Sequence, residues 1–94
     1  MFVVTLRFAD KTKAPRLMDG HDAWIRRGFD DAVFLLVGSI RPNAGGAILA
    51  HNCSRAEIER RVQDDPFVAE GVVAAEIVEI APGRADPRLA FLQA

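Results

Sequence analysis

The most constraining feature of this sequence is a nearly unbroken apolar run, Val-Phe-Leu-Leu-Val-Gly-Ser-Ile, over residues 33–40. The run is too short for a typical buried helix and is rich in residues that favour strands, so it predicts a β-strand. Because successive side chains of a strand point to opposite faces, both faces of this strand carry apolar groups. Both faces must therefore be covered in the folded protein.

Three further strands are predicted around this run. Residues 2–8 have apolar side chains at every even position, with Thr5 and Arg7 between them, which is the period of a strand with one apolar face. Residues 41–46 contain proline, asparagine and two glycines and predict a turn, with Gly45-Gly46 inside it, before a third strand over 47–51. Residues 72–80 are apolar at nearly every position and predict the fourth strand.

Two helices are predicted between the strands. Pro15 suits the first turn of a helix, where its missing N–H costs nothing. Apolar residues and one histidine then recur at three- and four-residue spacing, which predicts an amphipathic helix. These residues are Leu17, Met18, His21, Trp24, Ile25, Gly28 and Phe29. Ser54 and Glu57 have the spacing of a capping box and predict the start of the second helix.

The resulting order, strand-helix-strand-strand-helix-strand, is typical of an α+β ferredoxin-like βαββαβ fold. In that fold both helices pack on one face of a four-stranded antiparallel sheet. Strands 33–40 and 72–80 are apolar on both faces, so the second face would be exposed in a monomer, which soluble proteins rarely tolerate. We therefore expect a homodimer closed through the open face of the sheet. The domain should span residues 1–81, followed by a C-terminal tail, residues 82–94.

Composition excludes several classes of protein. The chain has 94 residues, half of them apolar, which fits a single domain. A formal net charge of -1, with acidic and basic residues interspersed, argues against a nucleic-acid partner. The single cysteine, Cys53, cannot form an internal disulfide, and no apolar stretch is long enough to span a membrane. The first residues lack the basic region of a signal peptide, so we expect a cytoplasmic protein.

The sequence Asp64-Asp65-Pro66-Phe67 places a carboxylate where it should face the interior. Asp65 follows Ile58 by seven residues, so it falls on the inward stripe of the second helix, and Pro66 should end that helix at Asp65. A buried carboxylate needs a partner, and His21 lies on the inward stripe of the first helix. A carboxylate that accepts from one imidazole nitrogen leaves the other nitrogen free for proton transfer. The alternative is structural, with His21 bonded to a backbone carbonyl and Asp65 capping a turn.

Other residues of catalytic type give weaker patterns. His51 and Cys53 lie two apart at the end of the third strand, and a following helix N-terminus would lower the pKa of a thiol, which makes Cys53 a candidate nucleophile. The alternative is that Cys53 fills space in the core and His51 is solvated. Two histidines and one cysteine show no metal-ligand spacing, so we expect no metal and no cofactor. Trp24, on the helical stripe, fits the core or a ligand-stacking position.

Several of these motifs together resemble the YCII-related (YciI-like) family. They are the opening Met1-Phe2-Val3-Val4, the segment His21-Asp22-Ala23-Trp24, a strand ending at Gly38, Gly45-Gly46, Ser54-Arg55-Ala56-Glu57, and Asp64-Asp65-Pro66-Phe67 with Gly71. The resemblance covers residues 1–81 and implies a dimeric α/β barrel of ferredoxin-like subunits. It also implies an active site built on a histidine-aspartate pair, here His21 and Asp65. Where many relatives have Gly-Pro after the second strand, this chain has Gly38-Ser39.

The functional prediction is a small-molecule enzyme of unknown substrate, with lyase, dehalogenase or isomerase-like chemistry. His21 would act as general acid and base, and Asp65 would orient its ring. Ser39, Gly38, Trp24 and Phe67 are the predicted substrate-binding residues. The alternative is a non-catalytic metabolite-binding or regulatory module that uses the same pocket for a small-molecule ligand.

Overall fold

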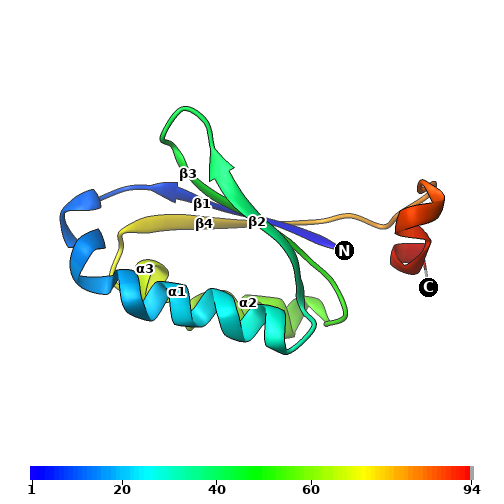
Figure 1. Ribbon diagram of the computed structural model, residues 1–94, viewed down its shortest axis with the longest axis horizontal. Helices are drawn as coiled ribbons and strands as arrows, with labels where there is room; N and C mark the ends of the chain where they lie inside the picture. The colour runs from blue at the N-terminus through cyan, green and yellow to red at the C-terminus, as the bar shows by residue number, and fades with distance from the viewer. Residues whose placement is uncertain (94) are drawn as a thin grey trace.

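The computed structural model describes residues 1–93 and contains one four-stranded antiparallel sheet in the order β2-β3-β1-β4 (Figure 1). The strands are β1 (Phe2–Phe8), β2 (Phe34–Ile40), β3 (Gly45–Ala50) and β4 (Val73–Glu79). The helices are η1 (Lys11–Lys13), α1 (Ala14–Asp30), α2 (Arg55–Gln63), α3 (Pro66–Ala69) and η2 (Pro87–Gln93). This arrangement confirms the predicted ferredoxin-like α+β fold.

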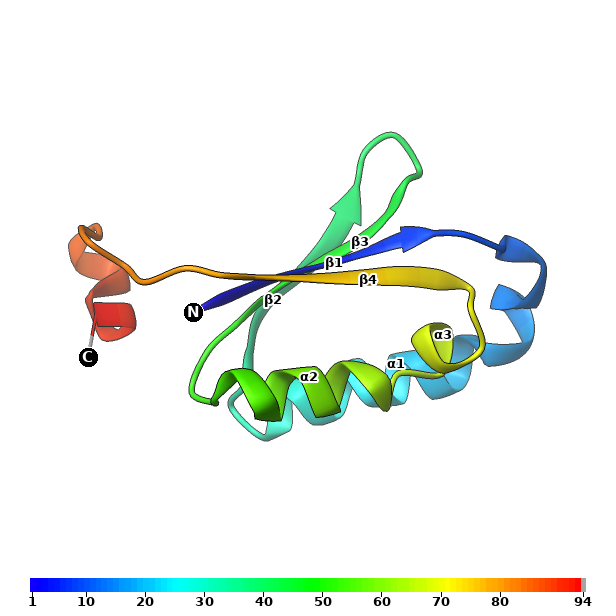
Figure 2. The same ribbon diagram turned by 180° about the vertical axis from the view of Figure 1, so that it is seen from behind.

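The helices α1, α2 and α3 all lie against the same face of the sheet (Figures 1 and 2). The even residues of β1, Phe2, Val4 and Leu6, point toward them and are buried, as the alternation predicts. Trp24 of α1 and Ile58 of α2 meet these strand residues in the core. The core therefore lies between the single helix layer and the sheet.

Local sequence signals explain where the helices begin. Ser54 caps α2: its hydroxyl accepts from the Glu57 N–H at 3.1 Å, and the Glu57 carboxylate accepts from the Ser54 N–H at 3.3 Å. This reciprocal pair is the predicted capping box. Pro15 lies in the first turn of α1, also as predicted.

The strand β3 begins two residues earlier than predicted. Gly45 and Gly46 were expected in the turn, but they are paired with β1 on one side and β2 on the other. Gly45 has a φ of 135°, and a Cβ at this position would lie 1.9 Å from the backbone oxygen of Leu6. Glycine is required there by a close approach between strands, so the turn itself is confined to residues 41–44.

The face of the sheet opposite the helices has no cover within residues 1–93. Leu36 of β2, Val78 of β4 and Ile80, which follows β4, are among the exposed large apolar side chains, with Leu36 at 53% exposure. In the sheet register Leu36 pairs with Leu49 and Val78 pairs with Val3, so these side chains share one face. This is the apolar open face that the sequence predicted.

The C-terminal tail extends away from the domain and ends in η2 (Figure 1). Leu89 and Phe91 of this segment are exposed, and the Phe91 ring meets the His51 ring edge-on with centroids 5.5 Å apart. Ala94, the last residue of the predicted tail, lies outside the described residues. Over residues 1–93, no helix combines the length and the apolar character needed to cross a membrane.

Candidate active site

His21 and Asp65 are in direct contact although 44 residues separate them in the chain. The Nδ1 atom of His21 lies 2.8 Å from Oδ1 of Asp65. His21 projects from α1, and Asp65 lies at the junction of α2 and α3. The two inward stripes identified in the sequence therefore converge on one hydrogen bond.

Asp65 owes its position to the residue that follows it. Its backbone is extended, with φ -68° and ψ 122°, which is the conformation that Pro66 favours for the preceding residue. This conformation makes Asp65 the N-cap of α3, and Oδ1 accepts from the Phe67 N–H at 3.0 Å. One oxygen thus accepts two hydrogen bonds.

Asp65 is completely buried, with 0% exposure. Its second oxygen, Oδ2, has no hydrogen-bond partner among the described residues. A carboxylate in such surroundings depends strongly on each remaining partner, because unpaired buried charge is costly. The contact with His21 is therefore important both for burying Asp65 and for orienting the imidazole.

Aromatic packing fixes the plane of the His21 ring. The Phe67 ring lies parallel to it, with an interplanar angle of 4° and centroids 4.0 Å apart. The Trp24 ring lies one helical turn further along α1, at 6.0 Å from the imidazole. Phe67 follows Asp65 by two residues, so the same short segment both hydrogen-bonds His21 and stacks on it.

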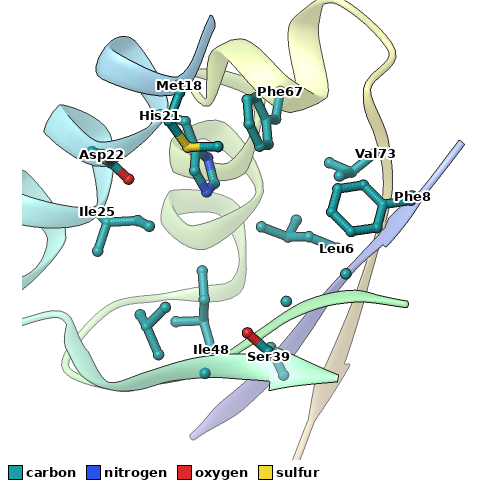
Figure 3. A pocket seen from close by; sticks show the side chains of 15 residues that line it. Leu6, Phe8, Met18, His21, Asp22, Ile25, Ser39, Ile48, Phe67 and Val73 are labelled. Carbon is teal, nitrogen blue, oxygen red and sulfur yellow. The ribbon is translucent and has the colours of Figure 1, made fainter. Parts of the chain in front are cut away.

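The imidazole reaches into a pocket of about 380 Å³ between the helix layer and the sheet (Figure 3). Among residues 1–93, His21 carries the only imidazole that lines the cavity, and its side chain is 14% exposed. The lining residues are Leu6, Phe8, Met18, His21, Asp22, Ile25, Val37, Gly38, Ser39, Gly45, Gly46, Ala47, Ile48, Phe67 and Val73. Asp65 is not among them, so it lies behind the imidazole as seen from the pocket.

The arrangement defines which nitrogen is available for chemistry. An ionised carboxylate can only accept hydrogen bonds, so Nδ1 of His21 donates to Asp65. In the neutral ring Nε2 then carries the lone pair and faces outward from the pair. The pocket thus has a positioned group that can accept and return a proton.

The predicted substrate-binding residues divide into two groups. Ser39, Gly38 and Phe67 line the pocket together with His21. Trp24 does not: it is only 1% exposed, and its indole N–H donates to the Arg61 carbonyl at 2.8 Å. Of the two positions that the sequence allowed for Trp24, the structure shows the core position, and Trp24 is not the pocket residue that its prediction as substrate-binding implied.

Several lining residues were missed by the sequence analysis. Asp22, next to His21 on α1, is the second acidic side chain near the imidazole. Leu6 and Phe8 were assigned only to the apolar face of β1, and Val73 only to β4. The alternation of apolar residues implied that these three side chains lie on the helix-facing side of the sheet. It did not show that they line a pocket, because that depends on how far α1 and α3 extend over this face.

The surroundings of Cys53, in the second predicted cluster, disfavour a reactive thiolate. Cys53 is half-buried, and burial, followed by the nearby Glu57 carboxylate, raises the pKa of its thiol. This direction is opposite to the lowering expected from the helix N-terminus and fits the alternative that Cys53 packs against the core. Over residues 1–93 there is no group of three or more side chains positioned to hold a metal ion.

Comparison with known proteins shows a solved structure with a similar fold. No protein-family model and no curated protein matches the chain. Among solved structures, it is similar to 5-chloro-2-hydroxyhydroquinone dehydrochlorinase (TftG) from Burkholderia phenoliruptrix AC1100, in complex with 2,5-dihydroxybenzoquinone. The TM-score is 0.62 with 17% sequence identity, over 88% of this chain and 96% of that chain. At this identity the likeness supports the fold, and the resemblance to YCII-related proteins stays a prediction.

Proposed function

We propose that this protein is a small-molecule enzyme in which His21 is the general acid and base and Asp65 orients it. The observation that carries the proposal is the 2.8 Å hydrogen bond between a fully buried carboxylate and an imidazole that lines a pocket. A buried acidic partner behind a pocket-facing histidine is an arrangement suited to proton transfer. The reaction class is lyase, dehalogenase or isomerase-like chemistry.

In this proposal Nε2 of His21 removes a proton from the substrate. In an isomerisation it returns the proton to another substrate atom, and in an elimination it passes the proton to solvent after the leaving group has departed with the bonding electron pair. While the ring carries the extra proton, the Asp65 carboxylate stabilises the imidazolium across the Nδ1 hydrogen bond. Phe67 keeps the ring plane fixed by stacking, so little reorganisation accompanies each transfer. Ser39 and Gly38, on the opposite wall, bind the substrate.

Two likenesses support the reaction class. The solved structure of similar fold is that of a dehydrochlorinase, named for its action on 5-chloro-2-hydroxyhydroquinone. We also propose that the chain belongs with the YCII-related proteins, on the motifs described above. Both likenesses are consistent with proton removal coupled to loss of a leaving group.

The test is a turnover screen of small hydroxylated and halogenated ring compounds with wild type and His21→Ala. We expect His21→Ala to lower kcat by roughly a hundred- to ten-thousand-fold, the usual contribution of a positioned acid or base. His51→Ala is the matched control, because His51 contacts the tail ring of Phe91 and does not line the pocket. Unchanged turnover in His21→Ala would contradict the assignment, and ligand-induced thermal stabilisation without any product would instead support a binding module.

We further propose that the working form is a homodimer closed through the open face of the sheet. Leu36 and Val78 lie on this face and are 53% and 44% exposed, which is unfavourable for a soluble monomer. Pairing two such faces would bury them and give the barrel that the family resemblance implies.

A further inference from the structure

We infer that the pocket selects small uncharged molecules with an apolar skeleton and rejects carboxylates and phosphates. The inference rests on the proposed function in taking this pocket as the substrate site. It goes further by assigning the charge class of the substrate and by giving Asp22 a role in selecting it.

The lining is almost entirely apolar. Of the 15 residues that line the cavity, only His21, Asp22 and Ser39 have polar side chains, and they come from α1 and β2 (Figure 3). The other walls are formed by hydrocarbon or by glycine backbone. An apolar ring or branched chain gains free energy by leaving water for such walls.

No lysine or arginine occurs among the described residues that line the pocket. An anionic ligand would therefore be buried without a cationic partner, which is costly. The imidazolium form of His21 does not fill this role, because the Asp65 carboxylate at 2.8 Å already balances its charge. The cavity thus lacks the usual means of holding a carboxylate or a phosphate.

Asp22 adds a repulsive element. It is exposed at the pocket, next to His21 on α1, and no ion pair within residues 1–93 involves it. An incoming anion would therefore meet a carboxylate that is in no ion pair among the described residues. Rejection through an unfavourable contact is a common route to specificity.

Lys11 places a cation against one of the residues that line the pocket. Its ammonium lies 4.7 Å from the centroid of the Phe8 ring, and Phe8 is part of the pocket wall. The same ammonium donates to the Asn43 carbonyl at 3.4 Å, outside the lining. It is therefore held by two groups of the protein, and Lys11→Gln provides a check on its influence.

The size of the cavity limits the ligand as well. A volume of about 380 Å³ is near the lower end for small-molecule sites. A ring with one or two small substituents fits this volume. Benzamide and benzoate are suitable probes because they share shape and size and differ in charge.

The experiment is an NMR titration of the 15N-labelled protein at pH 7.5 with benzamide and, separately, with benzoate. The backbone amides of Gly45 and Gly46 report on the pocket directly. We expect benzamide to shift these signals with a dissociation constant at least about tenfold lower than that of benzoate, because the unpaired anion carries a burial cost. Equal affinities, a preference for benzoate, or no shift with either probe would overturn the inference.

Charge reversal tests the role of Asp22. The preference for benzamide is the dissociation constant of benzoate divided by that of benzamide. We expect Asp22→Lys to lower this ratio by roughly two- to fivefold, the scale of an exposed charge interaction. Asp19→Lys is the matched control, since Asp19 is exposed on the same helix and does not line the pocket. The ratio should be unchanged in Asp19→Lys and in Lys11→Gln. An effect of equal size in Asp19→Lys and Asp22→Lys, or none in Asp22→Lys, would contradict the inference.

The two proposals can fail separately. Normal turnover in His21→Ala would remove the catalytic role of His21 and leave the preference for benzamide intact. Equal binding of benzamide and benzoate would remove the charge selectivity and leave the loss of turnover in His21→Ala unaffected.

Discussion

At the residue scale, a single carboxylate oxygen of Asp65 serves two purposes. Oδ1 caps α3 through the Phe67 N–H and also accepts from His21. The first contact is a local structural device, whereas the second joins elements far apart in the chain. A variant that keeps both contacts but loses the charge, compared with one that loses both contacts, can therefore separate a structural clamp from a chemical pair.

Asparagine at position 65 preserves both contacts in neutral form. Its side-chain oxygen caps a helix as well as aspartate does and can still accept from Nδ1 of His21. We expect Asp65→Asn to lower the free energy of unfolding by less than about 1 kcal/mol, and Asp65→Ala, which loses both contacts, by about 2–4 kcal/mol. Urea unfolding of both variants measures this. A loss of several kcal/mol in Asp65→Asn would favour the purely structural reading, in which the charged pair is a buried clamp between the helices.

Two inward stripes and one proline suggested that His21 and Asp65 lie close together, but the same spacing also allowed His21 to bond a backbone carbonyl while Asp65 capped a turn. The stacking of Phe67 on His21 was not predictable. Phe67 was expected at the site, but its parallel contact with the imidazole depends on the short helix α3 and on the distance between α1 and α3. Helical spacing alone also could not separate His21, which faces the pocket, from Trp24, which faces the core.

At the element scale, the close contact between β1 and β3 depends on glycine. A side chain at position 45 would overlap the backbone oxygen of Leu6, and Gly45 has a φ of 135°, which other residues rarely adopt. The sequence showed a glycine pair and favoured a turn. Only the pairing of β3 with strands on both sides shows that these glycines belong to the sheet.

We expect Gly45→Ala to destabilise the protein by at least about 1–3 kcal/mol, the cost of the backbone conformation alone, with the steric overlap adding to it. Gly38→Ala is the control, since a Cβ at this position would meet nothing within 4 Å. Thermal unfolding of both variants measures the difference. Equal melting temperatures for Gly45→Ala and wild type would show that β3 does not approach β1 closely at this point.

At the scale of the whole molecule, the number, type and order of the main elements could be predicted because each pattern was long and periodic. The structure of the C-terminal tail could not be predicted, because its residues have no clear period and few contacts with the domain. The free sheet face, in contrast, was visible in the sequence as strands that are apolar on both sides.

We expect light scattering at micromolar concentration to return twice the mass of the 10.3 kDa chain. Leu36→Glu should shift the protein toward the monomer, because it places a charge on the open face. Gln63→Glu is the charge-matched control, since Gln63 is exposed on α2 in the helix layer. A wild-type mass of one chain would contradict the dimer and would assign the open face to a different partner.

The central claim is that Asp65 holds His21 with its proton on Nδ1, leaving Nε2 free to accept a proton from the substrate. Long-range 1H–15N NMR of the imidazole nitrogens in neutral His21 tests it directly, with His51→Gln used to assign the signals. We predict a protonated Nδ1 and an unprotonated Nε2 in wild type. We also predict that Asp65→Ser, which keeps a helix-capping hydroxyl but lacks the carboxylate, loses this preference. A wild-type ring protonated on Nε2, or a tautomer unchanged in Asp65→Ser, would contradict the account.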